Sequence, residues 1–281
     1  MHSLKDIQEV LENKGPKEGV DWLKDKISKL AESKSTKDLY MTYSLLSSKF
    51  DATVPEGFDN TSDISSYFES HNADLLQIAR IFLLSAVLEH DKDFYTPKVA
   101  NIIQVADTGE LETFLKSLIL LPNPEAYKQT AVEALRTNIA VIFDAICMNN
   151  PYPAKYFNDQ QWNQMYLKAA FMERDLSQIV AVDERANEDL TRIISDYAHE
   201  RWAASRKIEP MFWRPVSKFL NEQLLEDMKR LLDSEDIIEN RAGALCCKHS
   251  ENEKAITLLN QYPDVKQEIE TNKINWNTLK D

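Results

Sequence analysis

Glycine is scarce in this sequence, with 5 glycines among 281 residues. The chain also lacks clear runs of alternating apolar and polar residues, and the Asn-Gly pairs that join hairpin strands are missing. These absences argue against a sandwich or barrel of short strands, which depends on such turns. They favour an all-α protein.

Positive charge is also in short supply. Lysine and arginine number 33 against 46 aspartates and glutamates, which leaves a net charge of −13. Such a surface repels phosphates, so we expect no nucleic-acid partner. The longest apolar runs, such as residues 81–88, are too short to span a bilayer, and the N-terminal stretch has no apolar signal core. We expect a cytoplasmic protein that is not membrane-spanning.

Cysteine is rare and unpatterned. Cys147, Cys246 and Cys247 lie within apolar helical stretches, and an odd count without framework spacing favours reduced, buried thiols. No Cys-x-x-Cys or His-x-x-His spacing suggests a metal site. A glycine-rich phosphate loop and a nucleophile elbow are missing too. We therefore predict no metal and no cofactor, and the catalytic residues, if any exist, are unknown.

Apolar residues recur at helical spacing along nearly the whole chain. They predict one all-helical domain over residues 1–281, with roughly a dozen helices in a HEAT-like stack of antiparallel pairs or a closed α/α layer and no sheet. Within it we distinguish N-terminal helices and a loop (1–60), core helices (72–233) and C-terminal helices (234–281). The connection over residues 49–62 contains Pro55, Gly57 and Asn60. The sequence leaves open whether packing orders it.

Two core helices carry polar residues on apolar faces. A continuous helix predicted over residues 124–149 places Arg136 and Asn138 between apolar neighbours. The next helix, predicted over residues 159–172, is apolar around almost its whole circumference, which is typical of a helix buried on most sides. We expect it nearest the centre, so its Asn163 and Lys168 would need buried partners.

A third helix begins at Asn187, a favoured N-cap, and is predicted to run to about Arg206. Arg201 projects roughly 40° from Tyr197, on the face that should meet the core. Because charges are rarely buried unpaired, we predict that Arg201 is largely buried and bonded to a carboxylate, with Asp183 and Glu200 ahead of Asp144.

Each polar residue also has a purely structural interpretation. Arg201 could brace the helices through an ion pair, and Asn138 and Asn163 could satisfy interrupted backbone near residues 149–153. His199 is expected at the surface, and Trp202 with Trp213 is expected to serve packing. The alternative is a polar pocket between three consecutive helices.

Several long segments carry a resemblance to a known family. They are ALRTNI (134–139), NNPYPAKYF (149–157), WNQMYLKAAF (162–171), DERANEDL (183–190), DYAHERWA (196–203) and FWRPV (212–216). In these segments the chain resembles the EboA-domain family. The family pattern leads us to expect a glycine before Arg206, where this chain has Ser205.

The resemblance implies a role in a small biosynthetic and export pathway, with a pathway metabolite and other Ebo-type operon proteins as partners. It implies no catalytic residue, because the family's own activity is not established. The motifs and the polar positions together define the candidate ligand-binding residues: Arg136, Asn138, Asn163, Lys168, Asp183, Arg185, Tyr197, Glu200 and Arg201. Secondary candidates are Asn150, His199, Trp202, Trp213 and Arg214.

Two functions follow as hypotheses. In the first, the protein binds a polar or anionic small molecule, scaffolds the partner enzymes, or does both, without catalysis. In the second, it is an enzyme acting on a cyclitol, isoprenoid or phosphate-bearing intermediate, with carboxylate acid–base chemistry and Arg/Lys anion binding. The missing catalytic motifs favour the first hypothesis. It predicts that Arg136, Asn138, Asn163, Lys168 and Arg201 converge on one cavity, with room for an isoprenoid tail along Trp162 and Phe171.

Overall fold

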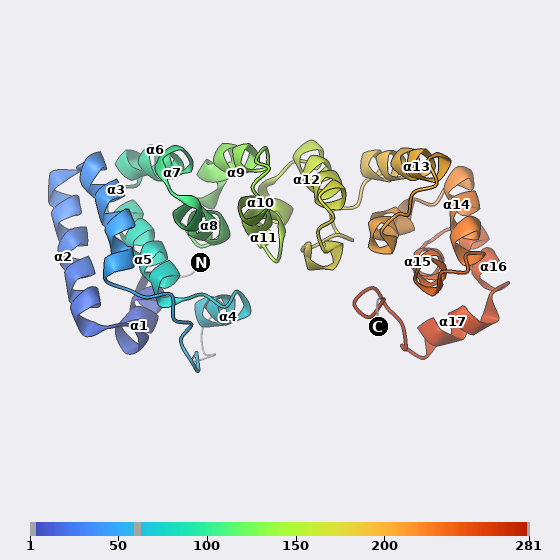
Figure 1. Ribbon diagram of the computed structural model, residues 1–281, viewed down its shortest axis with the longest axis horizontal. Helices are drawn as coiled ribbons and strands as arrows, with labels where there is room; N and C mark the ends of the chain where they lie inside the picture. Colours follow the sequence, from blue (N-terminus) through green and yellow to red (C-terminus); the bar gives the residue numbers. More distant parts are fainter. Residues whose placement is uncertain (1–3, 59–62, 280–281) are drawn as a thin grey trace. The chain divides into compact units, whose positions relative to one another are not determined.

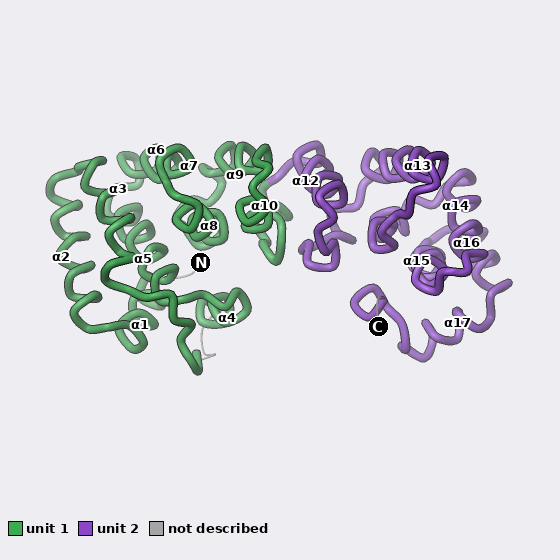
Figure 2. Tube along the Cα trace, viewed as in Figure 1, with its two compact units in different colours: residues 1–156 green, residues 157–281 purple. Residues whose placement is uncertain are grey.

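The computed structural model describes residues 4–58 and 63–279 of the chain. Helix makes up 71% of the structure and strand 0%, which confirms the all-α prediction. The chain forms two compact units, Met1–Tyr156 and Phe157–Asp281 (Figure 2). The boundary between them lies inside the segment predicted as the core, residues 72–233. The single domain and its HEAT-like stacking stay predictions.

Unit 1 contains eleven of the described α-helices and two short 3₁₀ segments (Figure 1). Most of its helices are shorter than 12 residues, which is at or below the mean length of helices in globular proteins. In chain order these elements are α1 (Leu4–Lys14), α2 (Lys17–Ser33), α3 (Thr36–Leu45), η1 (Leu46–Ser48), α4 (Asp63–Ser70), α5 (Leu75–His90), α6 (Lys92–Ala100), α7 (Ile102–Val105), α8 (Thr108–Ser117), η2 (Pro124–Tyr127), α9 (Lys128–Ala134), α10 (Ala140–Cys147) and α11 (Pro151–Tyr156).

Helix α5 forms the centre of unit 1. Asp74 starts it with a capping box, accepting a hydrogen bond from the Gln77 backbone while the Gln77 side chain accepts one from the Asp74 backbone. The eleven residues 78–88 are all buried, and the helix contacts α1, α2, α6 and α8. A helix that is apolar on every side has to be covered on every side, which α5 achieves.

The described part of the connection after η1 is packed. Phe50 and Phe58 are buried, and backbone carbonyls of Asp51 and Thr53 accept hydrogen bonds from the start of α5. Lys14 on α1 donates to two further carbonyls of this segment. These contacts order the connection through residue 58. Residues 59–62 of the predicted loop lie outside the described residues.

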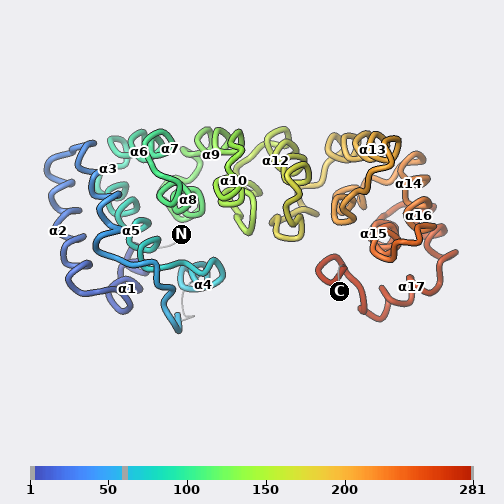
Figure 3. Tube along the Cα trace, viewed as in Figure 1, coloured from blue at the N-terminus to red at the C-terminus, as the bar shows by residue number. Residues whose placement is uncertain are grey.

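The helix predicted over residues 124–149 is interrupted. It consists of η2, α9 and α10, and the trace bends between α9 and α10 (Figure 3). Thr137 Oγ1 accepts a hydrogen bond from the Ile139 backbone at 3.1 Å, a local bond that competes with helical pairing. Arg136 and Asn138 are exposed in this link, so the prediction that they interrupt an apolar helical face was wrong.

Unit 2 contains the remaining described helices. Residues 210–232 form a 3₁₀ segment and then a helix, because Pro215 cannot donate a helical hydrogen bond and Asn221 caps a new start. The elements of unit 2 are α12 (Asp159–Phe171), η3 (Leu176–Gln178), α13 (Glu188–Ala203), η4 (Pro210–Phe219), α14 (Glu222–Leu232), α15 (Ile237–Lys248), α16 (Glu253–Leu259) and α17 (Pro263–Glu270).

Helix α15 occupies the centre of unit 2, where α12 was expected. Its residues 242–247 are all buried, and it contacts η4, α14, α16 and α17. Helix α12 has one buried face, with Trp162, Met165 and Tyr166 on it, but Phe171 is 77% exposed. The surplus apolar residues of α12 are therefore not core residues, and the prediction that this helix is buried on most sides was wrong.

Candidate functional site

Helix α13 carries most of the candidate residues of unit 2. Asn187 caps its start as predicted, with its side chain accepting a hydrogen bond from the Leu190 backbone at 2.9 Å. The helix ends in a Schellman motif, in which the Arg206 backbone donates to the Arg201 carbonyl and the Ser205 backbone to the Trp202 carbonyl. Ser205 has a φ of 54°, a left-handed conformation that favours glycine. The glycine expected before Arg206 thus corresponds to a real conformational demand at this helix end.

Arg201 does not form the predicted buried ion pair. Its side chain is only partly buried, and its Nε and Nη2 donate to the Lys207 carbonyl at 3.0 and 2.6 Å. Arg201 lies in the last turn of α13, so its long side chain reaches past the helix end to the reversing chain. Its guanidinium also lies 5.8 Å from the centre of the Tyr197 ring. The prediction of a largely buried Arg201 bonded to a carboxylate was wrong.

The predicted carboxylate partner, Asp183, binds a different arginine. Arg214 on η4 donates from Nε and Nη2 to the two carboxylate oxygens of Asp183, at 2.9 and 2.6 Å. This parallel pair is the geometry in which guanidinium and carboxylate bind most strongly. Lys218 adds a hydrogen bond to the Asp183 carbonyl. Asp183 and Arg214 therefore join the loop before α13 to η4, and Glu200 is exposed.

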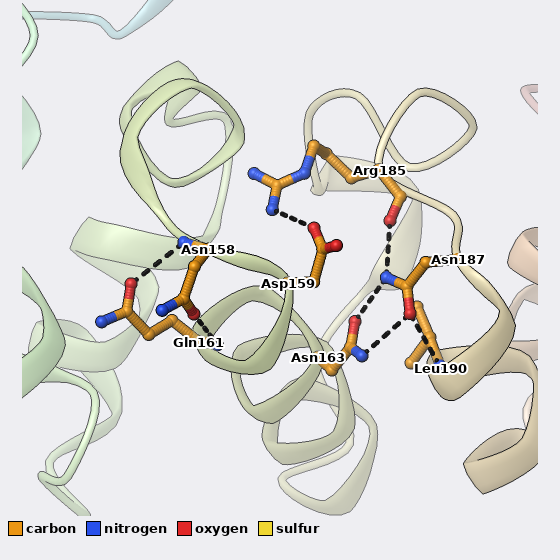
Figure 4. A network of polar contacts seen from close by, with 7 residues as sticks. All are labelled: Asn158, Asp159, Gln161, Asn163, Arg185, Asn187 and Leu190. Atoms are coloured by element: carbon orange, nitrogen blue, oxygen red, sulfur yellow. Dashed lines mark hydrogen bonds and ion pairs between the residues drawn. The ribbon is translucent and has the colours of Figure 1, made fainter.

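Asn163 finds its partner in Asn187, as Figure 4 shows. The two side-chain amides exchange hydrogen bonds of 3.1 and 2.9 Å, and Asn187 also donates to the Arg185 carbonyl. Arg185 in turn donates to Asp159 at 3.2 Å and lies 4.9 Å from the centre of the Trp162 ring. Because Asn163 is only 5% exposed, these bonds satisfy a buried amide that would otherwise be costly. The network fastens α12 to the start of α13.

The secondary candidates are also held by the fold. Asn150 is buried and donates to two backbone carbonyls. Trp202 stacks on the fully buried Trp213 with ring centres 5.5 Å apart, in agreement with the packing interpretation. His199 is 43% exposed, near the predicted surface position, and its Nε2 lies 2.6 Å from the buried carboxylate of Asp227.

A cavity of about 740 Å³ opens between the end of α12, the end of α13 and the start of η4. Its size is within the usual range for small-molecule sites. Tyr197 and Arg201, both candidates from the sequence, line it. We call it the polar hollow, and its lining residues are Ala170, Phe171, Glu173, Arg174, Asp175, Tyr197, Arg201, Lys207, Ile208, Glu209, Pro210, Phe212, Asp236, Ile238 and Glu239.

A second cavity, of about 380 Å³, shares Phe171, Tyr197 and Phe212 with the first. Apart from the Lys168 ammonium and the Tyr197 hydroxyl, the side chains around it are apolar. Burial lowers the pKa of Lys168, because a charged amine is disfavoured beside apolar groups. We call this cavity the apolar hollow, and its lining residues are Leu167, Lys168, Phe171, Ile193, Tyr197 and Phe212.

Aromatic stacking holds the shared wall in place. Phe212 stacks on the buried ring of Tyr166 at 5.9 Å and meets the edge of Tyr197 at 5.2 Å. The Tyr166 hydroxyl donates to the Met211 carbonyl at 3.2 Å, which ties η4 to α12. The wall is therefore built from three separate elements that meet at Phe212.

The charges of the polar hollow are mixed. Five carboxylates face three cationic side chains, so an anionic ligand has no net attraction to it. Many donors and acceptors do line it, and these suit hydroxyl groups, which both donate and accept. The carboxylates are Glu173, Asp175, Glu209, Asp236 and Glu239, and the cations are Arg174, Arg201 and Lys207.

The structure thus brings Lys168, Tyr197 and Arg201 around two adjoining hollows of unit 2. Sequence reasoning did not identify Phe212 or the turn over residues 207–209. The sequence predicts Phe171 as a surface for an isoprenoid tail, and the surplus apolar residues of α12 are the signal for it. Arg136 and Asn138 belong to unit 1, so the convergence of all five polar residues on one cavity stays a prediction.

Within residues 4–58 and 63–279, no group of three or more His, Cys, Asp or Glu side chains is placed to hold a metal ion. The three cysteines are buried and free, and burial raises the pKa of Cys247 to about 12. A helix with the length and apolar character needed to cross a membrane is absent from the same residues.

Comparisons with known proteins agree with the motifs. No match was found among curated proteins or among solved structures. A family model described as "Metabolite traffic protein EboA" matches residues 4–217, which include every described helix of unit 1, α12, α13 and most of η4. Because this match covers well over half of the chain, the protein belongs to the EboA family.

Proposed function

We propose that this protein binds and carries a metabolite with a polyhydroxylated end and an apolar segment, and that unit 2 holds the binding site. The observation that carries the proposal is the wall of Phe171, Tyr197 and Phe212 shared by the polar and apolar hollows. A ligand lying along this wall would place hydroxyl groups among charged side chains and its apolar segment among Leu167 and Ile193. The family's description as metabolite traffic proteins supports a carrier role.

The exposure of Phe171 supports the same proposal. A phenylalanine that is 77% exposed leaves apolar surface in water. Covering about 100 Å² of such surface with a ligand contributes roughly 2.5 kcal/mol. The aromatic wall would thus supply affinity, and the mixed charges of the polar hollow would supply selectivity for hydroxyl groups.

The charge balance refines the expectation drawn from the sequence. With five carboxylates and three cations, the polar hollow favours a neutral polyhydroxylated group over an anion. Lys168, whose pKa burial lowers, stands at the apolar hollow and could donate a hydrogen bond to an oxygen on the apolar segment.

The proposal is tested with n-octyl β-glucoside below its micelle concentration, because this probe joins a sugar to an alkyl chain. Calorimetry should show saturable binding to the full chain, with glucose alone and octanoate alone binding at least tenfold more weakly. Phe171→Ser should weaken binding about tenfold, because roughly 1.4 kcal/mol of apolar contact is lost. Ile256→Ser is the matched control, since it removes another exposed apolar side chain, on α16, that lines neither hollow.

Two outcomes would contradict the proposal. One is the absence of saturable binding by the parent protein. The other is equal binding by Phe171→Ser and the parent, which would mean that the probe contacts another surface. A scaffolding role for partner enzymes, catalysis and a cytoplasmic location stay predictions from the sequence.

A further inference from the structure

A third hollow, of about 400 Å³, lies beyond the end of α13 and has the opposite charge character. Three cationic side chains and a single carboxylate, Glu239, line it, together with Trp202 and Leu231. In a chain of net charge −13 this is a local concentration of positive charge. We call it the cationic hollow and define it by Arg206, Lys207, Arg230, Trp202, Leu231 and Glu239.

We propose that the cationic hollow binds a phosphate group of a small molecule. A phosphate monoester carries a charge of about −1.5 to −2 near neutral pH, which matches the net positive charge of the lining. Guanidinium groups suit its oxygens, because they donate several hydrogen bonds in one plane. The site lies outside the wall formed by Phe171, Tyr197 and Phe212, and the proposal does not rest on the function proposed above.

The end of α13 is built in a way that weakens a repulsion. The last carbonyls of a helix carry partial negative charge, which disfavours an anion nearby. Here the carbonyls of Glu200, Arg201 and Trp202 accept backbone hydrogen bonds from the turn that follows. The Schellman turn therefore satisfies these carbonyls and places Arg206 at its far end.

One of the three cationic side chains is held by an aromatic ring, and none of the three has a strong ion pair among the described residues. The Arg230 guanidinium lies 4.1 Å from the centre of the Trp202 ring, whose stacking partner is the fully buried Trp213. Among the described residues, no ion pair is found for Arg230 or Arg206. Lys207 has a 3.5 Å pair with Asp236, but its side chain is 88% exposed, so this pair is weak.

Arg201 gives the hollow a fixed edge. Its two hydrogen bonds to the Lys207 carbonyl hold the backbone of the turn that carries Arg206 and Lys207. The stacked tryptophans hold the opposite edge at Arg230. Two cationic edges on fixed supports lose less conformational entropy on binding an anion than free surface lysines do.

The test uses inorganic pyrophosphate and inorganic phosphate as probes, at constant ionic strength near neutral pH. Calorimetry on the full chain should show one saturable site. Trp202 provides a second signal, because an anion that attracts Arg230 changes the surroundings of its ring.

Arg206→Gln and Arg230→Gln should each weaken pyrophosphate binding about tenfold, and both side chains are exposed, so the variants should fold. Arg192→Gln is the matched control, since Arg192 is an exposed arginine on α13 that pairs with Asp196 and does not line the cationic hollow. Equal loss in all three variants would indicate general charge attraction and overturn the proposal, and so would no saturable binding by the parent. Because neither probe has an apolar part, failure here leaves the octyl glucoside result unaffected.

Discussion

The two units differ in how they accommodate an arginine on a helix: Arg80 is buried beside a carboxylate, whereas Arg201 is partly exposed and bonds to the backbone. In unit 1, Arg80 lies in the middle of α5 and is 5% exposed, with Glu110 of α8, itself 4% exposed, 3.9 Å away. The Arg80 guanidinium also lies 5.4 Å from the centre of the Tyr43 ring, and its Nε has no hydrogen-bond partner among the described residues. In unit 2, Arg201 lies at the end of α13, remains partly exposed and bonds to a backbone carbonyl.

The difference shows that an arginine needs a carboxylate partner in the middle of a buried helix but not in the last turn of a helix. The buried ion pair expected for Arg201 does exist in this protein, but at Arg80. Helix α5 is covered on every side, so a guanidinium in its middle cannot reach water and has to meet a carboxylate. A long side chain in a last helical turn can reach past the end of the helix, and Arg201 does so. We infer that Arg80 serves stability, whereas Arg201 is available at a hollow.

The largest expected effect tests this comparison of Arg80 with Arg201 directly. Arg80→Met should lower the free energy of unfolding by about 3–5 kcal/mol, because the Glu110 carboxylate would stay buried without a counter-charge. Arg201→Met should cost only ~1 kcal/mol, since its hydrogen bonds lie at an exposed helix end. Urea unfolding measures both values. An Arg201→Met variant less stable than Arg80→Met would contradict the assignment, and Arg80→Met/Glu110→Gln should recover much of the loss.

Thiol labelling shows which unit the arginine stabilises. Cys147 lies in unit 1, Cys246 and Cys247 lie in unit 2, and all three are buried with pKa values raised by burial. In the folded protein they should react slowly with iodoacetamide, because the thiolate is the reactive form. Arg80→Met should speed labelling of Cys147 more than that of the other two. Equal acceleration at all three would show that the two units unfold together.

A second prediction concerns close packing at the centre of unit 2. A Cβ added at Gly243 on α15 would lie 2.8 Å from Leu231 Cβ and 3.2 Å from the Met228 carbonyl oxygen on α14. Gly243→Ala should therefore destabilise by about 1–3 kcal/mol through overpacking. Gly109→Ala in unit 1 is the matched control, because its nearest atom would be 3.6 Å away. Thermal unfolding with an unchanged Tm for Gly243→Ala would contradict the close approach of α14 and α15.

The smallest expected effect concerns Ser205, the left-handed residue just after the end of α13. Ser205→Gly should stabilise the protein by about 1 kcal/mol, because glycine adopts the φ of 54° without steric cost. Ser28→Gly, at an exposed position inside α2, is the control and should destabilise by roughly 0.5–1 kcal/mol. If both variants lose stability equally, Ser205 does not hold the left-handed conformation in solution.

Local signals predicted a large part of the fold. The all-α class, the Asn187 cap and the extent of α12 and α13 follow from residues close together in sequence. The break at residues 135–139 was missed because Thr137 and Asn138 were judged by the apolar pattern around them. The local hydrogen bond of Thr137 outweighed that pattern.

The candidate site was harder to predict, because it depends on contacts between distant segments. Arg201 and Tyr197 line the same hollow, but the burial of Arg201 depends on how near it lies to the helix end and on the turn after it. The polar hollow needs Phe212 beside Tyr197, which the 3₁₀ course of η4 produces and no local pattern indicates. The surplus apolar residues on α12 were a visible signal, and two of them, Leu167 and Phe171, line the apolar hollow and not the core.

The central claim, that unit 2 carries a metabolite, is tested most directly by a native mass spectrum of the protein purified from its own cells. The account predicts an added mass of one small molecule on the parent protein, reduced in Phe171→Ser and kept in Ile256→Ser. A parent protein without added mass, or the same added mass in all three, would contradict it.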